Sequence, residues 1–250
     1  MAKERVALIT AAGRGIGAAC ARELAHRGYR VALMSPSERS VALAKELGGI
    51  GFRGSVLEEA DIRRVVDAAL EKYGRIDGVI NNTGWEKWSV EAESAGIGFS
   101  WKVEGHLLDI PDDGWHESFD LMFMNVVKMA RHVTEPMKRQ GGGAILNIST
   151  PVAIEPTQDY PISSTIRAML ASFTKLYSDA YARYNIRMNS ILVGYVSNYQ
   201  FPPENRLSIP MGRPAPPEEI ARACAAFLSD DAAYVTGENI AVDGGIKRSL

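Results

Sequence analysis

The chain of 250 residues contains little cysteine, no excess of positive charge and no long apolar run. Its two cysteines, Cys20 and Cys224, are too few for a disulfide framework or a cysteine-rich metal cluster. Both fall within helical patterns, so we expect them to be small buried hydrophobic side chains. His106 and His116 have no second cluster of ligands beside them, which favours solvated histidines over a metal site.

The charge and the first residues argue against two further classes of protein. A net charge of -2 argues against a surface for nucleic acid or an anionic membrane, because such a surface needs clustered lysine and arginine. The apolar segment that begins after Arg5 is too short for a signal peptide or a membrane span. We therefore expect a cytoplasmic protein that binds neither nucleic acid nor a membrane.

What the sequence does contain is a regular alternation of strand and helix patterns. With 46% hydrophobic and 23% charged residues, the chain is long enough for one complete core. Apolar and β-branched runs predict strands over residues 5–10, 30–34, 50–54, 76–81, 144–149, 187–193 and 239–242. Helical spacing predicts helices over residues 15–27, 38–47, 60–73, 113–138, 160–184 and 217–228. This alternation indicates a doubly wound parallel sheet of about seven strands with helices on both faces, the α/β Rossmann fold, in a single domain over residues 1–250.

The stretch over residues 144–185 is the most informative part of this pattern. A short apolar run after three glycines indicates a buried strand, and a loop with two prolines follows it. From Tyr160 onwards, apolar residues at helical spacing predict a helix of about 25 residues. Ligands collect at the carboxyl ends of strands in such sheets, so Tyr160 stands where chemistry is expected.

A glycine-rich turn follows the first predicted strand and opens the first helix. It reads Thr-Ala-Ala-Gly-Arg-Gly-Ile-Gly over residues 10–17. Gly13, Gly15 and Gly17 would let the backbone approach a pyrophosphate held at the helix N-terminus. A tight turn with nothing bound is the alternative.

At this point the chain resembles the short-chain dehydrogenase/reductase family, over nearly all of its length. The glycine turn matches, except that Ala11 stands where the family has its first glycine. An Asn-Asn-Thr-Gly segment over residues 81–84, Asn125 and Tyr160 then match in the family's order. Residues 212–220 and 234–245 look like its closing helix and last strand. The resemblance implies an NAD(P)-dependent oxidoreductase that transfers a hydride between nicotinamide and a carbonyl or alcohol substrate.

Charge favours NADP(H) over NAD(H) as the cofactor. Enzymes of this architecture that use NAD usually place an acid at the end of the second strand. That strand ends here in Ser35-Pro36-Ser37, while Arg14 and Arg39 lie nearby, and a guanidinium suits a 2′-phosphate. Both arginines are alternatively solvated helix-start residues. Ser55 replaces an aspartate that the family often places against the adenine. The expected cofactor residues are Thr10, Gly13, Arg14, Gly15, Ile16, Gly17, Ser35, Arg39, Ser55, Val56, Asn82, Thr83, Gly84, Gly194 and Val196.

The resemblance also implies the catalytic residues. Tyr160 would give a proton to the carbonyl oxygen, a serine would polarise that oxygen, and Asn125 would anchor a water. The serine position aligns best with Thr150, with Ser149 one residue earlier, and threonine still supplies a hydroxyl donor.

The family's lysine, four residues after the tyrosine, is absent. Ser164 stands there, and no Tyr-x-x-x-Lys occurs in the chain. Lowering the pKa of a phenol from near 10 to about 7 takes roughly 4 kcal/mol, which a serine hydroxyl does not supply. Arg167 lies on the same predicted helix face as Tyr160 and is the candidate substitute. The alternative is that Arg167 is an exposed or subunit-contact residue. The positive charge of the oxidised nicotinamide, or a bound water, would also help to lower the pKa of the Tyr160 phenol.

Two functions of different class follow. The first is an NADP(H)-linked carbonyl reductase or alcohol dehydrogenase, with an alkaline optimum in the oxidising direction. The second is a catalytically weak or inactive dinucleotide-binding protein that acts as a sensor or an assembly partner.

An insertion over about residues 85–111 lengthens the link after the fourth strand. It lies in a segment that carries all four tryptophans of the chain, Trp85, Trp88, Trp101 and Trp115. Long loops of this kind are usually functional or form interfaces, and tryptophan is favoured at both. The segment after Gly194, which forms a substrate lid in the family, is short here. The insertion is therefore a candidate to share the lid's work, or to serve an oligomer contact.

The partners expected are a small-molecule substrate and further copies of the chain. In the family, the helices starting near Asp113 and Tyr160 form dimer and tetramer contacts, so we expect a homodimer or a homotetramer. Glu155 and Asp159 would favour a polar or cationic substrate if they faced the pocket, but a solvated loop is the alternative.

Overall fold

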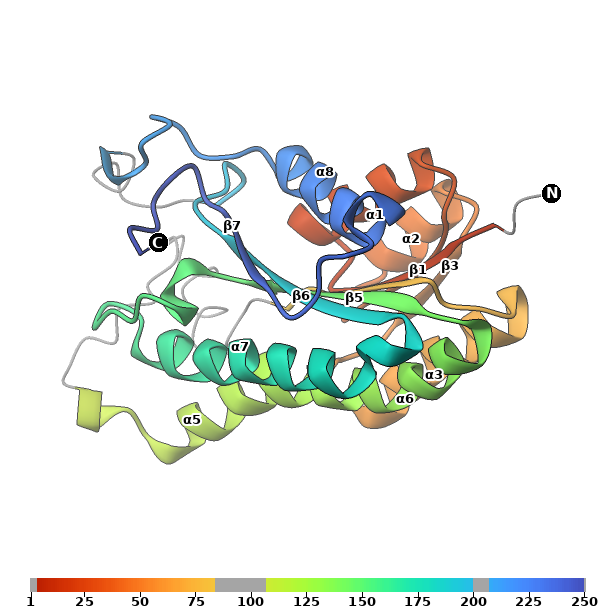
Figure 1. Cartoon of the computed structure of the whole chain (residues 1–250), viewed down its shortest axis with the longest axis horizontal. Coiled ribbons are helices and arrows are strands. Elements are labelled where there is room, and N and C mark those ends of the chain that lie inside the picture. Colours follow the sequence, from red (N-terminus) through yellow and green to blue (C-terminus); the bar gives the residue numbers. More distant parts are fainter. Residues whose placement is uncertain (1–3, 84–106, 200–206, 250) are drawn as a thin grey trace.

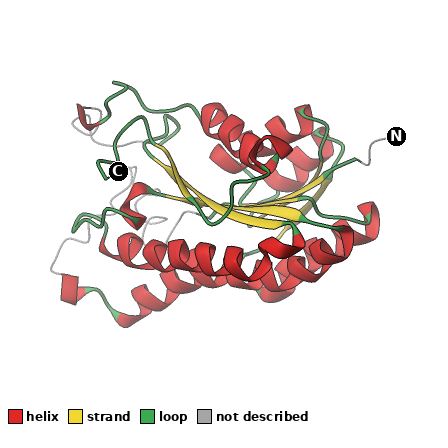
Figure 2. Ribbon diagram, in the orientation of Figure 1, coloured by secondary structure: helices red, strands yellow, loops and turns green. Residues whose placement is uncertain are grey.

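The computed structural model of the chain describes residues 4–83, 107–199 and 207–249. Seven parallel strands form one sheet in the order β3-β2-β1-β4-β5-β6-β7 (Figures 1 and 2). The strands are β1 Val6–Thr10, β2 Arg30–Ser35, β3 Ile50–Arg53, β4 Gly78–Asn81, β5 Gly143–Ser149, β6 Ile186–Val193 and β7 Asn239–Val242. The predicted doubly wound sheet is confirmed.

Helices cover both faces of the sheet (Figure 1). They are α1 Gly15–His26, α2 Arg39–Glu46, α3 Glu59–Tyr73, α5 Asp112–Phe119, α6 Asn125–Gln140, α7 Pro161–Tyr181 and α8 Pro217–Leu228. One apolar cluster joins α1, α2 and α8 to the sheet, and a second joins α3, α6 and α7 to its other face. In the described part of the chain, none of the helices has the length and hydrophobicity that a bilayer crossing requires.

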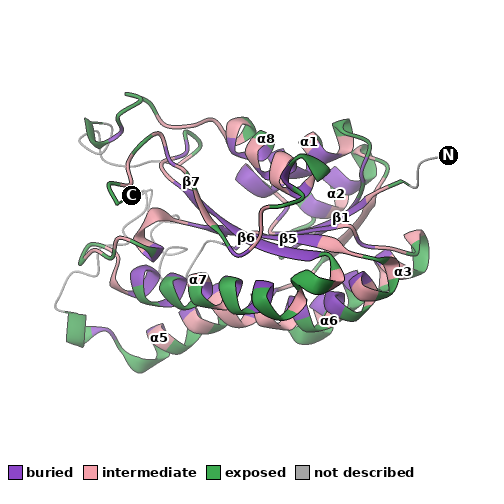
Figure 3. Cartoon of the chain, in the orientation of Figure 1, coloured by how far each residue is buried: buried purple, intermediate pink, exposed green. Residues whose placement is uncertain are grey.

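The strands are apolar on both faces because both are covered. In β1, Ala7 and Ile9 belong to the first cluster and Leu8 to the second, as the two-residue period of a strand requires. Strands β1, β4 and β6 are buried along their whole length (Figure 3). This explains why their sequences are near-continuous hydrophobic runs.

The predicted helix over residues 113–138 differs from the structure in its middle. Helix α5 passes into a π-helical turn, Asp120–Met124, before α6 begins. The Asn125 side-chain amide donates to the Leu121 carbonyl, while its backbone N–H donates to Asp120, five residues back. The side chain thus takes the acceptor that a regular α-helix would use, which is why hydrophobic spacing alone missed the interruption.

The predicted insertion lies almost wholly outside the described residues. Only its last part is described, and it includes a short 3-10 helix, Leu107–Asp109.

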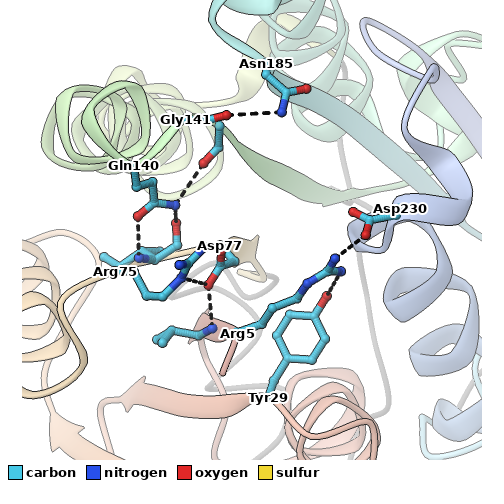
Figure 4. A network of polar contacts seen from close by, with 11 residues as sticks. Arg5, Tyr29, Arg75, Asp77, Gln140, Gly141, Asn185 and Asp230 are labelled. Atoms are coloured by element: carbon cyan, nitrogen blue, oxygen red, sulfur yellow. Dashed lines mark hydrogen bonds and ion pairs between the residues drawn. The ribbon is translucent and has the colours of Figure 1, made fainter. Parts of the chain in front are cut away.

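The amino ends of the strands are joined by a polar network on the edge opposite the glycine turn (Figure 4). The Asp77 carboxylate pairs with Arg75 and accepts from the Val6 backbone N–H at 2.8 Å. Gln140 receives the Ile76 N–H at 3.0 Å and returns a hydrogen bond to the Ile76 carbonyl. These contacts hold the starts of β1 and β4 and the end of α6 together. The candidate site lies at the opposite edge, where the strands have their carboxyl ends.

Candidate active site

Most of the residues that the sequence points to lie at or just after the carboxyl ends of strands β1 to β6. Because all strands are parallel, these ends share one edge of the sheet. The strands follow one another outward from β1 to β3 on one side and from β4 to β7 on the other, so the direction of winding changes between β1 and β4. Ligands bind at such a switch point in open α/β sheets.

The glycine turn joins the ends of β1 and β4. The Thr10 hydroxyl accepts the Asn82 N–H at 3.0 Å and donates to the Asn82 carbonyl at 3.2 Å. A Cβ added at Gly17 would lie 2.5 Å from the Ala11 carbonyl oxygen, so only glycine packs there. Gly15 has φ +54° and Ala11 has φ +46°, so the alanine keeps the left-handed conformation that favours a glycine. Ile16, between the last two glycines, is buried.

Two further polar side chains lie over this turn, and the sequence did not single them out. A Cβ added at Gly15 would lie 3.0 Å from the Asn198 amide nitrogen and 3.3 Å from the Tyr199 hydroxyl. Both residues follow the end of β6. Their position just beyond a strand end is the signal that would have found them.

The end of β2 carries hydroxyls and arginines. Ser35 is buried and donates to the Ser37 carbonyl at 3.0 Å, next to Gly13. Arg14 and Arg39 are both exposed beside this turn. The Arg53 guanidinium donates to the Pro36 carbonyl at 3.1 Å. Hydroxyl and guanidinium donors fit an anionic group here.

Ser55 and Val56 lie between β3 and α3. The Ser55 N–H donates to the Asp61 carboxylate at 2.9 Å, and the Ser55 hydroxyl accepts from Leu57 at 3.2 Å. Val56 is buried. The hydrogen bonds of Ser55 therefore lie within its own turn. Asp61 places a carboxylate next to this turn between β3 and α3.

The end of β4 places Asn82 and Thr83 beside the glycine turn. The Asn82 amide donates to the Ala11 carbonyl at 3.4 Å, and Thr83 is buried. Gly84 lies outside the described residues. Asn125 is buried at the π-helical turn, with its amide on the Leu121 carbonyl. A π-helical turn inside an α-helix frequently marks a functional site.

The end of β5 presents Ser149 and Thr150. Ser149 is buried. The Thr150 hydroxyl oxygen is also buried, and it has no hydrogen-bond partner among the described residues. A buried hydroxyl costs free energy unless it is paired. An oxygen of a bound molecule is the kind of partner that would satisfy it.

Tyr160 precedes the first residue of α7 and has a second phenol as its neighbour. Its N–H donates to the Thr157 carbonyl at 3.2 Å, and its carbonyl accepts from Ser164 at 2.8 Å. Burial raises the pKa of the Tyr160 phenol, and the charge of Tyr195, the hydrogen bond to Tyr195 and the charge of Asp159 raise it further. Tyr195 is a residue that the sequence patterns did not single out.

Ser164, which stands at the position of the family's lysine, and Arg167, the candidate substitute for that lysine, both make hydrogen bonds to other parts of the chain. The Ser164 hydroxyl accepts from the Thr157 N–H at 3.2 Å and donates to the Thr157 carbonyl at 3.4 Å, so it holds the loop before the helix. Arg167 is only 4% exposed. Its guanidinium donates to the Ile148 carbonyl at 2.9 Å and to Ser163 at 3.2 Å. It is not among the groups that shift the pKa of Tyr160.

The segment after β6 is fixed against the last strand. A Cβ added at Gly194 would lie 2.8 Å from the Asp243 Cα, so the two backbones meet closely there. Val196 is buried and forms an isolated parallel bridge with Ala215.

Glu155 holds the C-terminal segment to this edge. Its carboxylate accepts the Arg248 N–H at 2.7 Å and the Ser249 N–H, and these bonds lower its pKa. The charge of Asp159 raises the pKa of the Tyr160 phenol. Within the described ranges, no group of three or more histidine, cysteine or acidic side chains is placed to hold a metal ion.

The chain matches known proteins along nearly its whole length. The sequence model of a family described as enoyl-(acyl carrier protein) reductase matches residues 10–247. A cis-4-hydroxycyclohexanecarboxylate dehydrogenase of Sinomonas cyclohexanicum is 32% identical over 97% of this chain and 96% of its own. The 3-oxoacyl-[acyl-carrier-protein] reductase FabG of Escherichia coli is 28% identical, over 97% of both chains.

The fold also matches solved structures. A 3-ketoacyl-(acyl-carrier-protein) reductase of Brucella melitensis, complexed with NADH, superimposes with a TM-score of 0.85 at 26% identity, over 98% of both chains. The TT0495 protein of Thermus thermophilus does so with a TM-score of 0.81 at 30% identity, over 97% of this chain and 99% of its own. The order of the motifs, the sheet and these matches agree, and the chain belongs to the short-chain dehydrogenase/reductase family of oxidoreductases.

Proposed function

We propose that the protein transfers a hydride between NADP(H) and a carbonyl or alcohol substrate, with Tyr160 as the proton donor. The observation that carries this proposal is the pairing of two features at one sheet edge. A phenol stands at the start of α7, and the Thr150 hydroxyl at the end of β5 is buried without a partner in the described chain. A hydroxyl donor and a proton donor are what a developing alkoxide needs.

Each catalytic residue has a stated task in this proposal. The Thr150 hydroxyl donates to the carbonyl oxygen, and Tyr160 gives that oxygen its proton. Asn125 fixes the π-helical turn between α5 and α6. The reduced nicotinamide, when bound, supplies the hydride.

The residues at the glycine turn fit a dinucleotide. Gly13, Gly15 and Gly17 bring the backbone close, while Asn198 and Tyr199 add polar atoms beside Gly15. Anions are favoured at the N-terminus of a helix, here α1. The other residues that we propose for cofactor binding are Thr10, Ile16, Ser55, Val56, Asn82, Thr83, Gly84, Gly194 and Val196.

The phosphate preference rests on charge at the end of β2. Arg14 and Arg39 would hold a 2′-phosphate, and Ser35-Pro36-Ser37 offers no carboxylate to repel it. Arg39→Ala should weaken NADPH binding about tenfold and leave NADH binding nearly unchanged. Arg131→Ala, an exposed arginine on α6, is the matched control. Equal loss for both nucleotides would contradict the assignment.

The relatives suggest where to look for the substrate. One relative is named for a ring-bearing hydroxy acid and others for 3-oxoacyl chains, so a ketone or secondary alcohol near a carboxyl-derived group is the class we propose.

The test is nicotinamide turnover with a panel of such compounds. The panel includes cyclic ketones bearing a carboxylate and 3-oxoacyl thioesters, and we expect at least one to consume NADPH. Tyr160→Phe should lower that rate by about 10²-fold or more, with NADPH binding retained. Tight NADPH binding without turnover of any compound would instead support the catalytically weak sensor or assembly partner.

A further inference from the structure

A buried arginine ties the end of β5 to the start of α7. Arg167 lies in the second turn of α7, on the face of the helix that is turned away from water. Its NH1 group donates to the Ile148 carbonyl at 2.9 Å, and its Nε–H donates to the Ser163 hydroxyl oxygen at 3.2 Å. Ile148 belongs to β5 and Ser163 to the first turn of α7, so one planar group joins the two elements.

Both contacts lie close to residues that the proposed function uses. Ile148 comes two residues before Thr150, and Ser163 comes three residues after Tyr160. Along the chain, Thr150 and Tyr160 are joined by residues 151–159, a segment that is partly exposed. Through Arg167 the two elements that present these residues are joined by two hydrogen bonds inside the protein.

The chemistry of the guanidinium suits this link. Its donors lie in one rigid plane, and hydrogen bonds from a charged donor are stronger than those between neutral groups. The neighbouring Ser164 has a different task, because its hydroxyl exchanges hydrogen bonds with the Thr157 backbone. Ser164 therefore holds the loop before α7, while Ser163 and Arg167 hold the strand.

We infer that Arg167 is a positioning residue that fixes the Thr150 hydroxyl relative to the Tyr160 phenol. This inference rests on the proposed function and deepens it. A carbonyl oxygen has to meet the Thr150 donor and the Tyr160 proton in the same transition state, so the separation of the two hydroxyls must be kept. A misplacement of about 1 Å can cost about a hundredfold in rate. Arg167 thus acts through β5 and α7, and not by lowering the pKa of the phenol.

The kinetic test compares two buried arginines. Arg187, at the opposite edge of the sheet, is 8% exposed, and its guanidinium also donates to backbone carbonyls, those of Phe227, Ser229 and Val235. Lysine at either position keeps the charge and loses the rigid set of donors. We expect Arg167→Lys to lower kcat about tenfold or more, with the KM for NADPH changed less than about twofold. Arg187→Lys should leave kcat unchanged. An equal loss of kcat in both variants, or none in Arg167→Lys, would overturn the inference.

A double-mutant cycle separates positioning from a general loss of structure. Thr150→Val removes the hydroxyl that Arg167 places and keeps the branched shape of the side chain. In this background, Arg167→Lys should lower kcat by no more than about twofold, because the pair of hydroxyls no longer exists. A loss in the Thr150→Val background as large as the loss in the unaltered protein would overturn the inference.

A measurement without substrate distinguishes a failure of this inference from a failure of the proposed function. 3-Fluorotyrosine at position 160 of the ligand-free protein reports the surroundings of the start of α7 by fluorine NMR. Its signal should shift or broaden in Arg167→Lys and stay unchanged in Arg187→Lys. Should Arg167→Lys fail to fold, Ser163→Ala removes one acceptor of the guanidinium and should change the signal in the same way, to a smaller extent.

The outcomes of this measurement are distinct. A signal at position 160 that neither Arg167→Lys nor Ser163→Ala changes would overturn the inference. A changed signal in a protein that reduces no carbonyl compound would refute the proposed function and leave the link between β5 and α7 intact.

Discussion

At the scale of single residues, the proposed chemistry depends on the Tyr160 phenol, whose surroundings favour its protonated form. Burial, Tyr195 and Asp159 all raise the pKa of Tyr160. The position of Tyr160 at a helix start was predictable, because the strand, the loop and the helical spacing are all local patterns. Its partner was not, since Tyr195 lies 35 residues later, and only the pairing of β5 with β6 brings the two together.

In the proposed reaction, the raised pKa of Tyr160 determines how the rates of carbonyl reduction and alcohol oxidation depend on pH. Reduction needs the phenol, which stays protonated well above neutral pH, so its rate should be flat between about pH 6 and 9. Oxidation needs the phenolate, so its rate should rise with pH across the same range. Steady-state rates in both directions, corrected for protein stability, check this. An oxidation optimum near neutral pH would contradict it and would point to a cation, such as Arg167, acting on the phenol.

Ala11 carries a conformational cost that a glycine would remove. Its φ of +46° is left-handed, and an L-residue loses about 1 kcal/mol or more there. We expect Ala11→Gly to raise the free energy of unfolding by up to about 1 kcal/mol. Urea denaturation measures it, with Ala42→Gly in α2 as the control, which should lower stability by a similar amount. Destabilisation by both variants would show that the turn is not strained.

At the scale of elements, the boundaries that sequence patterns missed are those decided by side-chain hydrogen bonds. The π-helical turn before α6 depends on the hydrogen bond from the Asn125 amide to the Leu121 carbonyl. The spacing of hydrophobic residues does not predict such a side-chain bond. The predicted strands agree closely with the structure, because apolar runs between helices are visible in the sequence.

The Glu155 carboxylate holds the last residues of the C-terminal segment. Bonds from the Arg248 and Ser249 N–H groups lower the pKa of Glu155 below its ordinary value of 4.5. A lowered pKa means that the contact is fully present at neutral pH and is lost as the pH falls through that lowered value. Hydrogen exchange of the Arg248 and Ser249 amides should therefore become faster relative to an unstructured peptide in acid, and in Glu155→Gln at neutral pH. Unaltered protection in Glu155→Gln would contradict this role for Glu155.

At the scale of the whole molecule, the two edges of the sheet have different tasks. The Arg75, Asp77 and Gln140 network ties the amino edge together (Figure 4). The carboxyl edge carries the glycine turn, Tyr160 and Tyr195. The sheet and its helices followed from alternation and resemblance. The predicted insertion stays a prediction, as does its role as a lid, because residues 85–106 lie outside the described chain.

Assembly is a prediction at the scale of the whole molecule. Leu176 and Met169 are 64% and 40% exposed on α7, and apolar side chains at this spacing suit a helix-to-helix contact between copies. We expect a homodimer or homotetramer that Leu176→Glu shifts toward smaller species in light scattering. Leu207→Glu, at a residue 89% exposed outside α7, is the control and should leave the assembly unchanged. Loss of assembly in the control alone would place the contact elsewhere.

Hydride transfer from nicotinamide with Tyr160 as the proton donor is tested most directly by following one deuterium atom. NADPH deuterated at the transferable position of its nicotinamide is mixed with the protein and an accepted ketone, and the product is weighed by mass spectrometry. We expect one deuterium on the former carbonyl carbon of each alcohol, at a rate that falls at least about a hundredfold in Tyr160→Phe. Deuterium transfer that proceeds equally well without the Tyr160 hydroxyl would contradict it.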